Sequence, residues 1–277
     1  MKQETTLPQE TSSPRRVWDG LNLQRWYRPT FSPQHGVYVI LAVAYLTGAI
    51  ASGTWNDATG LGFICAFLGF QAEYPISQQV IQRKTLKLRL LLWGGLYGSI
   101  ALAIAFYLYL QAPILVWLYA GIVAAFIADA IAISLRQQRS IWNEAIVFTA
   151  VCLACPLAYM ATTQTFTLAV LGLWLLDALF FCSAIFTVKL RKPKTASLMP
   201  ASIYHAIATL AAIALWFCGW ISLPIALAFG IRLLEFGAII VRLDWYRRTK
   251  IQNVAILETN VAILFLLVVA ISSAIAS

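Results

Sequence analysis

The sequence has little charge. Asp, Glu, Lys and Arg together make up 11% of its 277 residues, whereas hydrophobic residues make up 61%. Water-soluble globular proteins carry about 25% charged residues, because a charged shell has to cover the apolar core. A single soluble core also stops growing near roughly 250–300 residues and still keeps a polar surface. The composition therefore excludes a soluble enzyme, a disordered chain and a nucleic-acid binder.

The sequence also lacks the short motifs of several enzyme classes. It contains no GxxxxGK[ST], HExxH or GxSxG pattern, so phosphate-loop, zinc-protease and hydrolase chemistries have no motif support. Cysteines are few. Cys152 and Cys155 form a CxxC, but Pro156 follows it and no second such pair is present. We interpret all five cysteines as small buried apolar residues.

Long apolar runs fill most of the chain. The hydrocarbon core of a bilayer, about 30 Å thick, needs roughly 20 mostly apolar residues per helix, and reading for such runs predicts nine spanning helices. Their approximate bounds are 36–54, 58–75, 88–111, 113–134, 143–162, 166–188, 202–220, 222–242 and 252–276. We therefore expect an all-α membrane helix bundle over residues 31–277. A polar, basic and partly disordered tail over residues 1–30 precedes it.

The basic residues predict the direction of insertion, because Lys and Arg are enriched in cytoplasmic loops. Nineteen of the 20 lie in the N-terminal tail and in the connections after the second, fourth, sixth and eighth runs. They are Lys2, Arg15, Arg16, Arg25, Arg28, Arg83, Lys84, Lys87, Arg89, Arg136, Arg139, Lys189, Arg191, Lys192, Lys194, Arg242, Arg247, Arg248 and Lys250. This alternation predicts an N-terminus inside and a C-terminus outside, in a bacterial inner (plasma) or internal membrane. It also explains the net charge of +9 without a nucleic-acid partner.

Ionisable side chains within or at the ends of the predicted helices are the candidate functional residues. Each charge inside a bilayer costs at least about 2.5–3.5 kcal/mol, so it faces a partner or a wet cavity. The candidates are His35, Glu73, Asp129, Glu144, Lys189, His205, Arg232, Glu235 and Glu258. Almost all lie in the cytoplasmic half of their helix, which predicts a polar, cytoplasm-facing cavity beneath an apolar outer half. The alternative is that side chains near helix ends reach the interface without a function.

Arg232 is the deepest basic residue, near the middle of its predicted helix. Glu235 follows three residues later on the same helical face, so the spacing allows an intrahelical ion pair. Asp177, near the middle of the sixth run, is the other available partner. A purely structural pair and a functional one both remain open.

Several segments carry a family resemblance. They are Ser32-Pro33-Gln34-His35-Gly36, Tyr74-Pro75, Arg139-Ser140-Ile141-Trp142-Asn143-Glu144, Val188-Lys189-Leu190-Arg191, Tyr204-His205, and Arg232 with Glu258. In order and spacing they resemble the YwiC-like family of bacterial membrane proteins from about residue 31 to the end. Val37 and Tyr38 depart from the Ala-Trp that is common in the family. The family is mostly uncharacterised, so the resemblance implies a site rather than a reaction.

The expected architecture is also similar to the UbiA superfamily of membrane prenyltransferases. Those enzymes hold Mg²⁺ and a prenyl diphosphate with two Asp-rich motifs, after their second and sixth helices. The matching positions here are 71–75 and 189–194, with one carboxylate in the first and none in the second. Hard divalent ions bind through several carboxylate oxygens. Mg²⁺-diphosphate chemistry is therefore not supported, and neither a metal ligand nor another cofactor is assigned.

Three classes of function stay open, and the sequence does not decide whether the chain is an enzyme. In the first, basic side chains bind an anionic lipid or isoprenoid without metal. The binding candidates are Glu73, Asp129, Lys189, Arg191, Arg232 and Glu235, and the catalytic candidates are His35, His205, Glu144 and Glu258. The second class is a transporter or proton-coupled permease, although only Pro156 interrupts a predicted span. The third is a non-catalytic membrane scaffold with a filled interior. Membrane lipids are the expected partners, and the sequence does not indicate the oligomeric state.

Overall fold

The computed structural model describes residues 27–82, 85–192 and 197–276. These ranges contain helices and connecting turns and no strand. Residues 1–26 of the predicted tail lie outside the described residues. The same holds for seven of the basic residues used above, namely Lys2, Arg15, Arg16, Arg25, Arg83, Lys84 and Lys194. The all-α prediction is confirmed for the described part of the chain.

Helices occupy all nine predicted positions. They are α1 (His35–Ala51), α2 (Asp57–Ile81), α3 (Leu88–Gln111), α4 (Leu115–Ser134), α5 (Ile141–Val151), α6 (Ala154–Thr163), α7 (Leu168–Lys189), α8 (Leu198–Phe217), α9 (Leu223–Leu227), α10 (Gly230–Val241), α11 (Leu243–Arg248) and α12 (Ile251–Ala276). With α5 joined to α6 and α9 joined to α10, seven helices in the described ranges are long and apolar enough to cross a membrane. They leave out α1, which has 17 residues, and α2, which is the more polar. The count of nine spans and their orientation stay predictions.

Two of the spans are interrupted. Pro156 has no N–H to donate to the carbonyl of Cys152, and that carbonyl accepts from the amide of Cys155 instead, which separates α5 from α6. The expectation that only Pro156 breaks a span is wrong, because α10 is also separated from α9. There the amides of Phe229 and Arg232 bond to carbonyls three residues back, the tighter 3₁₀ pattern. No proline marks this second break.

Short polar side chains begin four of the helices. Asn56, Ser140, Thr167 and Ser197 each accept a hydrogen bond from a backbone N–H in the first turn of α2, α5, α7 and α8. Such N-caps satisfy donors that a helix leaves unpaired at its start. For α8 the cap places the start at Leu198, four residues before the predicted 202. His205 therefore lies two turns inside this helix rather than at its opening.

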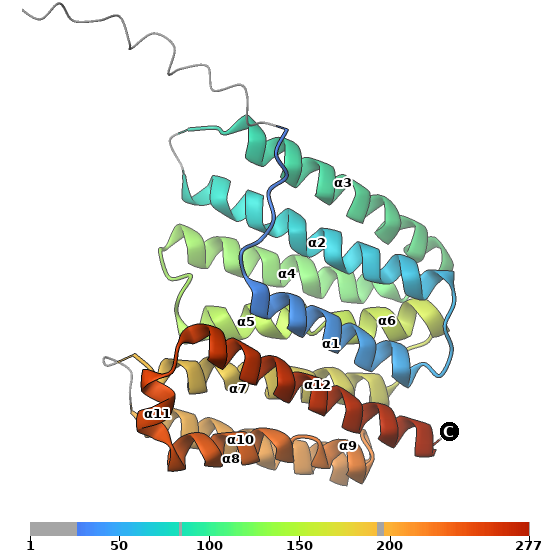
Figure 1. Ribbon diagram of the computed structural model, residues 1–277. Helices are drawn as coiled ribbons and strands as arrows, with labels where there is room; N and C mark the ends of the chain where they lie inside the picture. The colour runs from blue at the N-terminus through green and yellow to red at the C-terminus, as the bar shows by residue number, and fades with distance from the viewer. Residues whose placement is uncertain (1–26, 83–84, 193–196, 277) are drawn as a thin grey trace, which may run out of the picture.

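The helices run side by side, with α2, α3 and α4 on one flank and α8 and α10 on the other (Figure 1). The largest apolar cluster lies between the flanks, where α1, α6, α7 and α12 contribute most of its buried residues. Residues such as Phe180, Phe181 and Phe265 stack at its centre. On the outside, α3, α4 and α8 expose large apolar side chains over most of their length. This distribution suits a bundle whose outer surface faces lipid.

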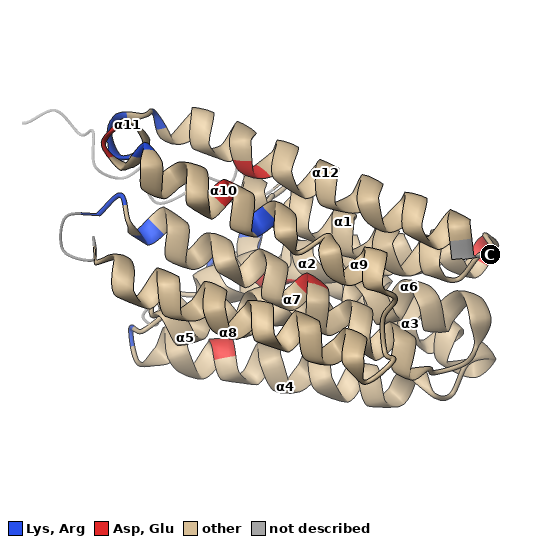
Figure 2. Cartoon of the chain, turned by 90° about the horizontal axis from the view of Figure 1, so that it is seen from below, with Lys and Arg blue, Asp and Glu red and all other residues tan. Residues whose placement is uncertain are grey.

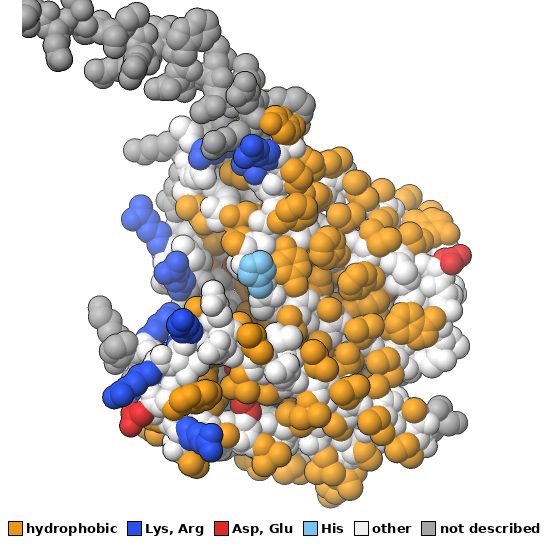
Figure 3. Space-filling view, viewed as in Figure 1, with side chains coloured by type: hydrophobic (Ala, Val, Ile, Leu, Met, Phe, Trp, Pro, Cys, Tyr) orange, Lys and Arg blue, Asp and Glu red, His pale blue; other side chains and the backbone are white. Residues whose placement is uncertain are grey.

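The two ends of the bundle differ in charge. The described Lys and Arg residues other than Arg232 gather at one end, here called the basic end, as Figures 2 and 3 show. The connections at the other end, here called the apolar end, contain no described Lys or Arg. A second apolar cluster, which includes Leu108, Leu115 and Met160, fills the space between α3, α4 and α6 there. Nearby, α1 passes so close to α6 that a Cβ at Gly48 would overlap the carbonyl oxygen of Cys155.

Candidate functional site

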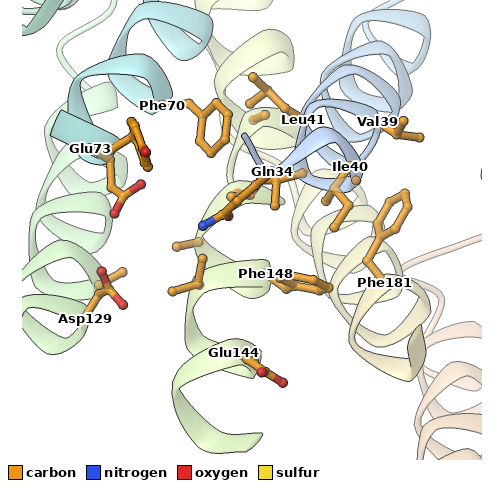
Figure 4. A pocket seen from close by; sticks show the side chains of 18 of the residues that line it. Gln34, Val39, Ile40, Leu41, Phe70, Glu73, Asp129, Glu144, Phe148 and Phe181 are labelled. Carbon is orange, nitrogen blue, oxygen red and sulfur yellow. The ribbon is translucent and has the colours of Figure 1, made fainter. Parts of the chain in front are cut away.

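A cavity of about 1070 Å³ extends into the bundle from the basic end. Helices α1, α2, α4, α5, α7 and α12 contribute most of its lining, and most of the lining side chains are apolar. It reaches as deep as Cys65 in α2 and Tyr119 in α4. Figure 4 shows apolar side chains such as Leu41, Phe70 and Phe181 together with the carboxylates of Glu73, Asp129 and Glu144, all of which line this cavity. An apolar cavity with a few convergent polar groups is the usual form of a small-molecule site.

The structure brings together most of the residues that the sequence singles out. The cavity lining includes His35, Glu73, Asp129, Glu144, Lys189, Arg232 and Glu258. It does not include Arg191, His205 or Glu235. The seven residues come from α1, α2, α4, α5, α7, α10 and α12, so only the folded bundle assembles the set.

Arg232 is at the centre of a buried ion cluster. Its Nη1 donates to Glu235 at 2.5 Å and to Glu258 at 2.7 Å, so the predicted intrahelical pair is present and Glu258, not Asp177, is the second partner. Its Nε donates to the backbone carbonyl of Phe180 at 3.0 Å, and the guanidinium lies 4.3 Å from the centre of the Phe180 ring. Arg232 is 1% exposed. These contacts replace the water that a buried guanidinium loses.

Glu258 links this cluster to the cavity. It is the more exposed of the two acidic partners, at 18% of its side chain against 5% for Glu235. The hydroxyl of Thr187 in α7 donates to its other oxygen at 3.4 Å. The Arg232 cluster thus presents one carboxylate to the cavity and keeps the other inside the protein.

Glu144 and Lys189 form a second ion pair on the cavity wall, with 2.5 Å between Lys189 Nζ and Glu144 Oε2. Glu144 is in the first turn of α5 and Lys189 ends α7. An acidic residue at a helix start and a basic residue at a helix end are each favoured by the helix dipole. The pair is partly exposed, at 12% for Lys189 and 30% for Glu144.

The segment before α1 is fixed to α2 by Gln71. The Gln71 side chain accepts from the backbone N–H of Ser32 at 3.2 Å and donates to the hydroxyl of Tyr38 at 2.7 Å. Tyr38 in turn donates to the carbonyl of Ser32 at 3.0 Å. Gln71 is 1% exposed. This network holds His35, which is exposed and opens α1, at the edge of the cavity.

Sequence reasoning did not select Gln71, Ser77, Asn143 or Thr187, all of which hold site residues in place. Ser32 and Asn143 do belong to the motifs on which the family resemblance depends, and this is the signal that could have found them. On α2, Gln71 lies one turn before Pro75 and Ser77 lies one turn after Glu73. Their roles depend on contacts between helices that spacing alone does not predict.

His205 and Arg191 lie outside the cavity. The ring of His205 is 2% exposed and stacks on Phe236 with 3.9 Å between ring centres, and its Nδ1 bonds to the carbonyl of Ala201. Arg191 donates to the carbonyl of Thr249 and lies over the ring of Tyr246. Burial raises the pKa of the Tyr246 hydroxyl above its ordinary value, so this group stays protonated. Both residues hold the basic end together.

Four of the cysteines are buried as predicted, and Cys218 is not. Cys65, Cys152, Cys155 and Cys182 are buried free thiols. Cys218 is exposed, because it follows the last turn of α8 on an outer helix. The Cys155 thiol neighbours Asp177, which is fully buried. The interpretation of all five as buried residues is therefore wrong for Cys218 alone.

The comparisons with known proteins find a similarity to one family over part of the chain. A family model described as YwiC-like protein matches residues 31–159. This range contains Ser32, His35, Glu73, Asp129 and Glu144, so it covers one wall of the cavity. No curated protein and no solved structure gives a significant match. The resemblance beyond residue 159 and the architectural similarity to UbiA enzymes stay predictions. From the segment before α1 into α6, the chain is similar to the YwiC-like family.

Proposed function

We propose that this protein binds a lipid with a phosphate-bearing headgroup in the cavity at its basic end. The lipid's apolar chain lies among the apolar side chains, and the phosphate lies against Arg139, Lys189 and Lys192, which line the cavity. One observation carries the proposal: a cavity of about 1070 Å³ that combines apolar walls with basic residues at one end. Phosphate binds well to such side chains through charge-assisted hydrogen bonds.

The basic set differs from the one predicted from sequence. Arg191 is replaced by Arg139, because Arg191 is held against Thr249 and Tyr246 whereas Arg139 lines the cavity. Among the catalytic candidates, His35 is the imidazole at the cavity, and an imidazole is the side chain that most often serves as a general acid or base. His35 is thus the candidate acid or base if the bound lipid is also modified.

The proposal includes nine membrane spans with the basic end in the cytoplasm, since the basic connections alternate with connections that lack Lys and Arg. A cytoplasm-active reporter fused after Ser277 tests this topology. It should be inactive, because the ninth helix places the C-terminus outside. An active reporter would contradict the nine-span arrangement.

Lipids retained by the purified protein, identified by mass spectrometry, test the binding itself. Phosphate-bearing lipids should be enriched in the wild type and depleted in an Arg139→Gln/Lys192→Gln variant. An Arg242→Gln/Lys250→Gln variant removes the same charge from exposed positions that do not line the cavity, and it should retain the lipid. Equal lipid content in both variants would contradict a role for the cavity's basic residues.

The apolar part of the site has its own test on α2. Gly69 lines the cavity and a Cβ there would meet nothing within 4 Å. A Gly69→Phe side chain therefore fills part of the cavity, and bound lipid should fall. Gly60, on the same helix, is equally open but does not line the cavity. Gly60→Phe should leave the lipid bound, and a loss in both variants would point to an effect on the helix instead.

A second candidate function, transport, is favoured by the interrupted α9–α10 span. Transporters use such discontinuous helices near the middle of the membrane to bind substrate or ions. Here the interruption is followed at once by Arg232, whose partner Glu258 lines the cavity. Proton flux into vesicles that contain the protein would separate the two functions, because a lipid-binding protein gives none.

A further inference from the structure

Two carboxylates on one wall of the cavity have no basic partner. Glu73 comes from α2 and Asp129 from α4, and Figure 4 shows them on the same side of the cavity, away from α1 and α7. They are close enough to interact electrostatically. None of the ion pairs among the described residues involves either of them. In this respect they differ from Glu144, Glu235 and Glu258, which all have a basic partner.

Neutral neighbours hold both carboxylates in place. Ser77 donates to Glu73 Oε1 at 2.5 Å, and Asn143 Nδ2 donates to Asp129 Oδ1 at 2.7 Å. No described residue donates to the second oxygen of either carboxylate. Asn143 is only 4% exposed, and its side-chain oxygen is buried without a donor. Glu73, Asp129 and Asn143, here called the acidic corner, therefore offer three oxygens and lack a donor.

Buried acceptors without donors are rare in proteins, and the Asn143 oxygen is one that calls for a missing partner. Two carboxylates in one apolar cavity also repel each other when both are charged, because the dielectric screening there is weak. A primary ammonium group supplies both a donor and a compensating charge, because it has three N–H donors and one positive charge. The acidic corner thus has the charge and the acceptor number that an ammonium group requires.

The position of the corner points to the kind of molecule that carries this ammonium. Asp129 is on the last turns of α4, Asn143 is on the first turn of α5, and Arg139 lies in the short connection between them. All three line the cavity. A headgroup whose phosphate meets Arg139 can therefore place a nearby amine at Asp129. We propose that the acidic corner binds the primary ammonium group of a zwitterionic aminophospholipid, an inference that rests on the proposed lipid-binding function.

Competition between lipids in the full-length purified protein tests this. The probes are phosphatidylethanolamine, which has the primary amine, and phosphatidylglycerol, which has none, compared by native mass spectrometry. The wild type should favour phosphatidylethanolamine by about tenfold, the lower end of the worth of a hydrogen bond to a charged group. A Glu73→Gln/Asp129→Asn variant should lose this preference while it still binds both lipids. An Asp57→Asn/Asp244→Asn variant, with the same charge change outside the lining, should keep it.

A titration with butylammonium separates this inference from the proposed function and needs no variant. Butylammonium has no phosphate, so it should compete with phosphatidylethanolamine but not with phosphatidylglycerol. Binding of butylammonium by a protein that retains no lipid would overturn the lipid proposal and leave the corner as an amine site. Equal binding of the two lipids, no effect of butylammonium, or displacement of the amine by Mg²⁺ would each overturn the inference, the last by assigning the corner to a metal ion.

Discussion

The apolar end and the basic end of this bundle are formed by the same long helices, but they differ in charge and in packing. Toward the apolar end, α1 touches the backbone of α6 at Gly48, and a cluster that includes Leu108 and Met160 fills the space beside α4. Toward the basic end, side chains of α1, α2, α4 and α5 line a cavity of about 1070 Å³. Filled interiors gain dispersion energy that a cavity forfeits. The cavity therefore lowers the stability of the protein, and such a loss is commonly tolerated at functional sites.

The two groups of charged residues at the cavity also differ in how their charges are paired. Arg232 has two carboxylates, a backbone carbonyl and an aromatic ring around it. Glu73 and Asp129 have a hydroxyl and an amide. The Arg232 cluster contains its own cation, although Glu235 Oε1 is buried without a donor. None of the ion pairs among the described residues supplies a cation to the acidic corner. The free energy of unfolding of suitable variants can distinguish a cluster that stabilises the fold from a ligand-binding site.

The largest effect should come from Arg232→Met. The substitution leaves Glu235 and Glu258 facing each other without a cation, and breaking a buried ion pair in this way costs about 3–5 kcal/mol. The free energy of unfolding of the detergent-solubilised protein should fall by that amount. Arg242→Met, at an exposed position next to α11, is the control and should change it little. Equal effects at the two positions would show that Arg232 is not needed to hold the bundle together.

Gly48→Ala should have the next largest effect. The new methyl group would overlap the carbonyl oxygen of Cys155, and overpacking of this kind costs about 1–3 kcal/mol. Gly36→Ala on the same helix meets nothing within 4 Å and should be neutral. Comparison of the two thermal midpoints checks the prediction. A tolerated Gly48→Ala would mean that the apolar end is less tightly packed than this contact indicates.

The sequence predicts the helices well because a lipid-facing helix is apolar on nearly every side. This requirement makes each run easy to read, and it also explains why most boundaries agree within a few residues. The end of α2 is one exception, because the helix continues to Ile81, six residues past the predicted 75. The start of α8 is a second, because Ser197 caps it before the apolar run begins. The break before α10 is a third. The residues around Ala228 and Phe229 are apolar like their neighbours, and only the hydrogen-bond pattern separates the two helices.

The site is predictable in part for a related reason. Charges at membrane depth are conspicuous, so His35, Glu73, Asp129, Arg232 and Glu258 can be selected from sequence. Spacing cannot decide which of them face each other. The local sequence pattern does not predict that Arg232 pairs with Glu258, 26 residues away. It also does not predict that His205 is buried against Phe236.

Asp129→Asn should have a small effect in the opposite direction from Arg232→Met. The amide keeps the oxygen that accepts from Asn143, and it removes one of two like charges beside Glu73. In lipid-free protein we expect the free energy of unfolding to rise by about 1 kcal/mol at most. Glu258→Gln is the contrast, since it takes one carboxylate from Arg232 and should lower stability. A loss at Asp129 as large as that at Glu258 would mean that the Asp129 carboxylate stabilises the fold as much as a carboxylate paired with Arg232 does.

The smallest effect should be the coupling between Glu144 and Lys189. Their atoms are 2.5 Å apart, but both side chains are partly exposed, and such ion pairs contribute about 0–1 kcal/mol. A double-mutant cycle with Glu144→Gln and Lys189→Met isolates this coupling from the effect of each substitution alone. We expect a coupling energy below about 1 kcal/mol in lipid-free protein. A phosphate bound at Lys189 competes with Glu144 for the same ammonium group, so added phospholipid should lower the coupling further. A coupling that lipid leaves unchanged would place the headgroup away from Lys189 and leave Arg139 and Lys192 to hold it.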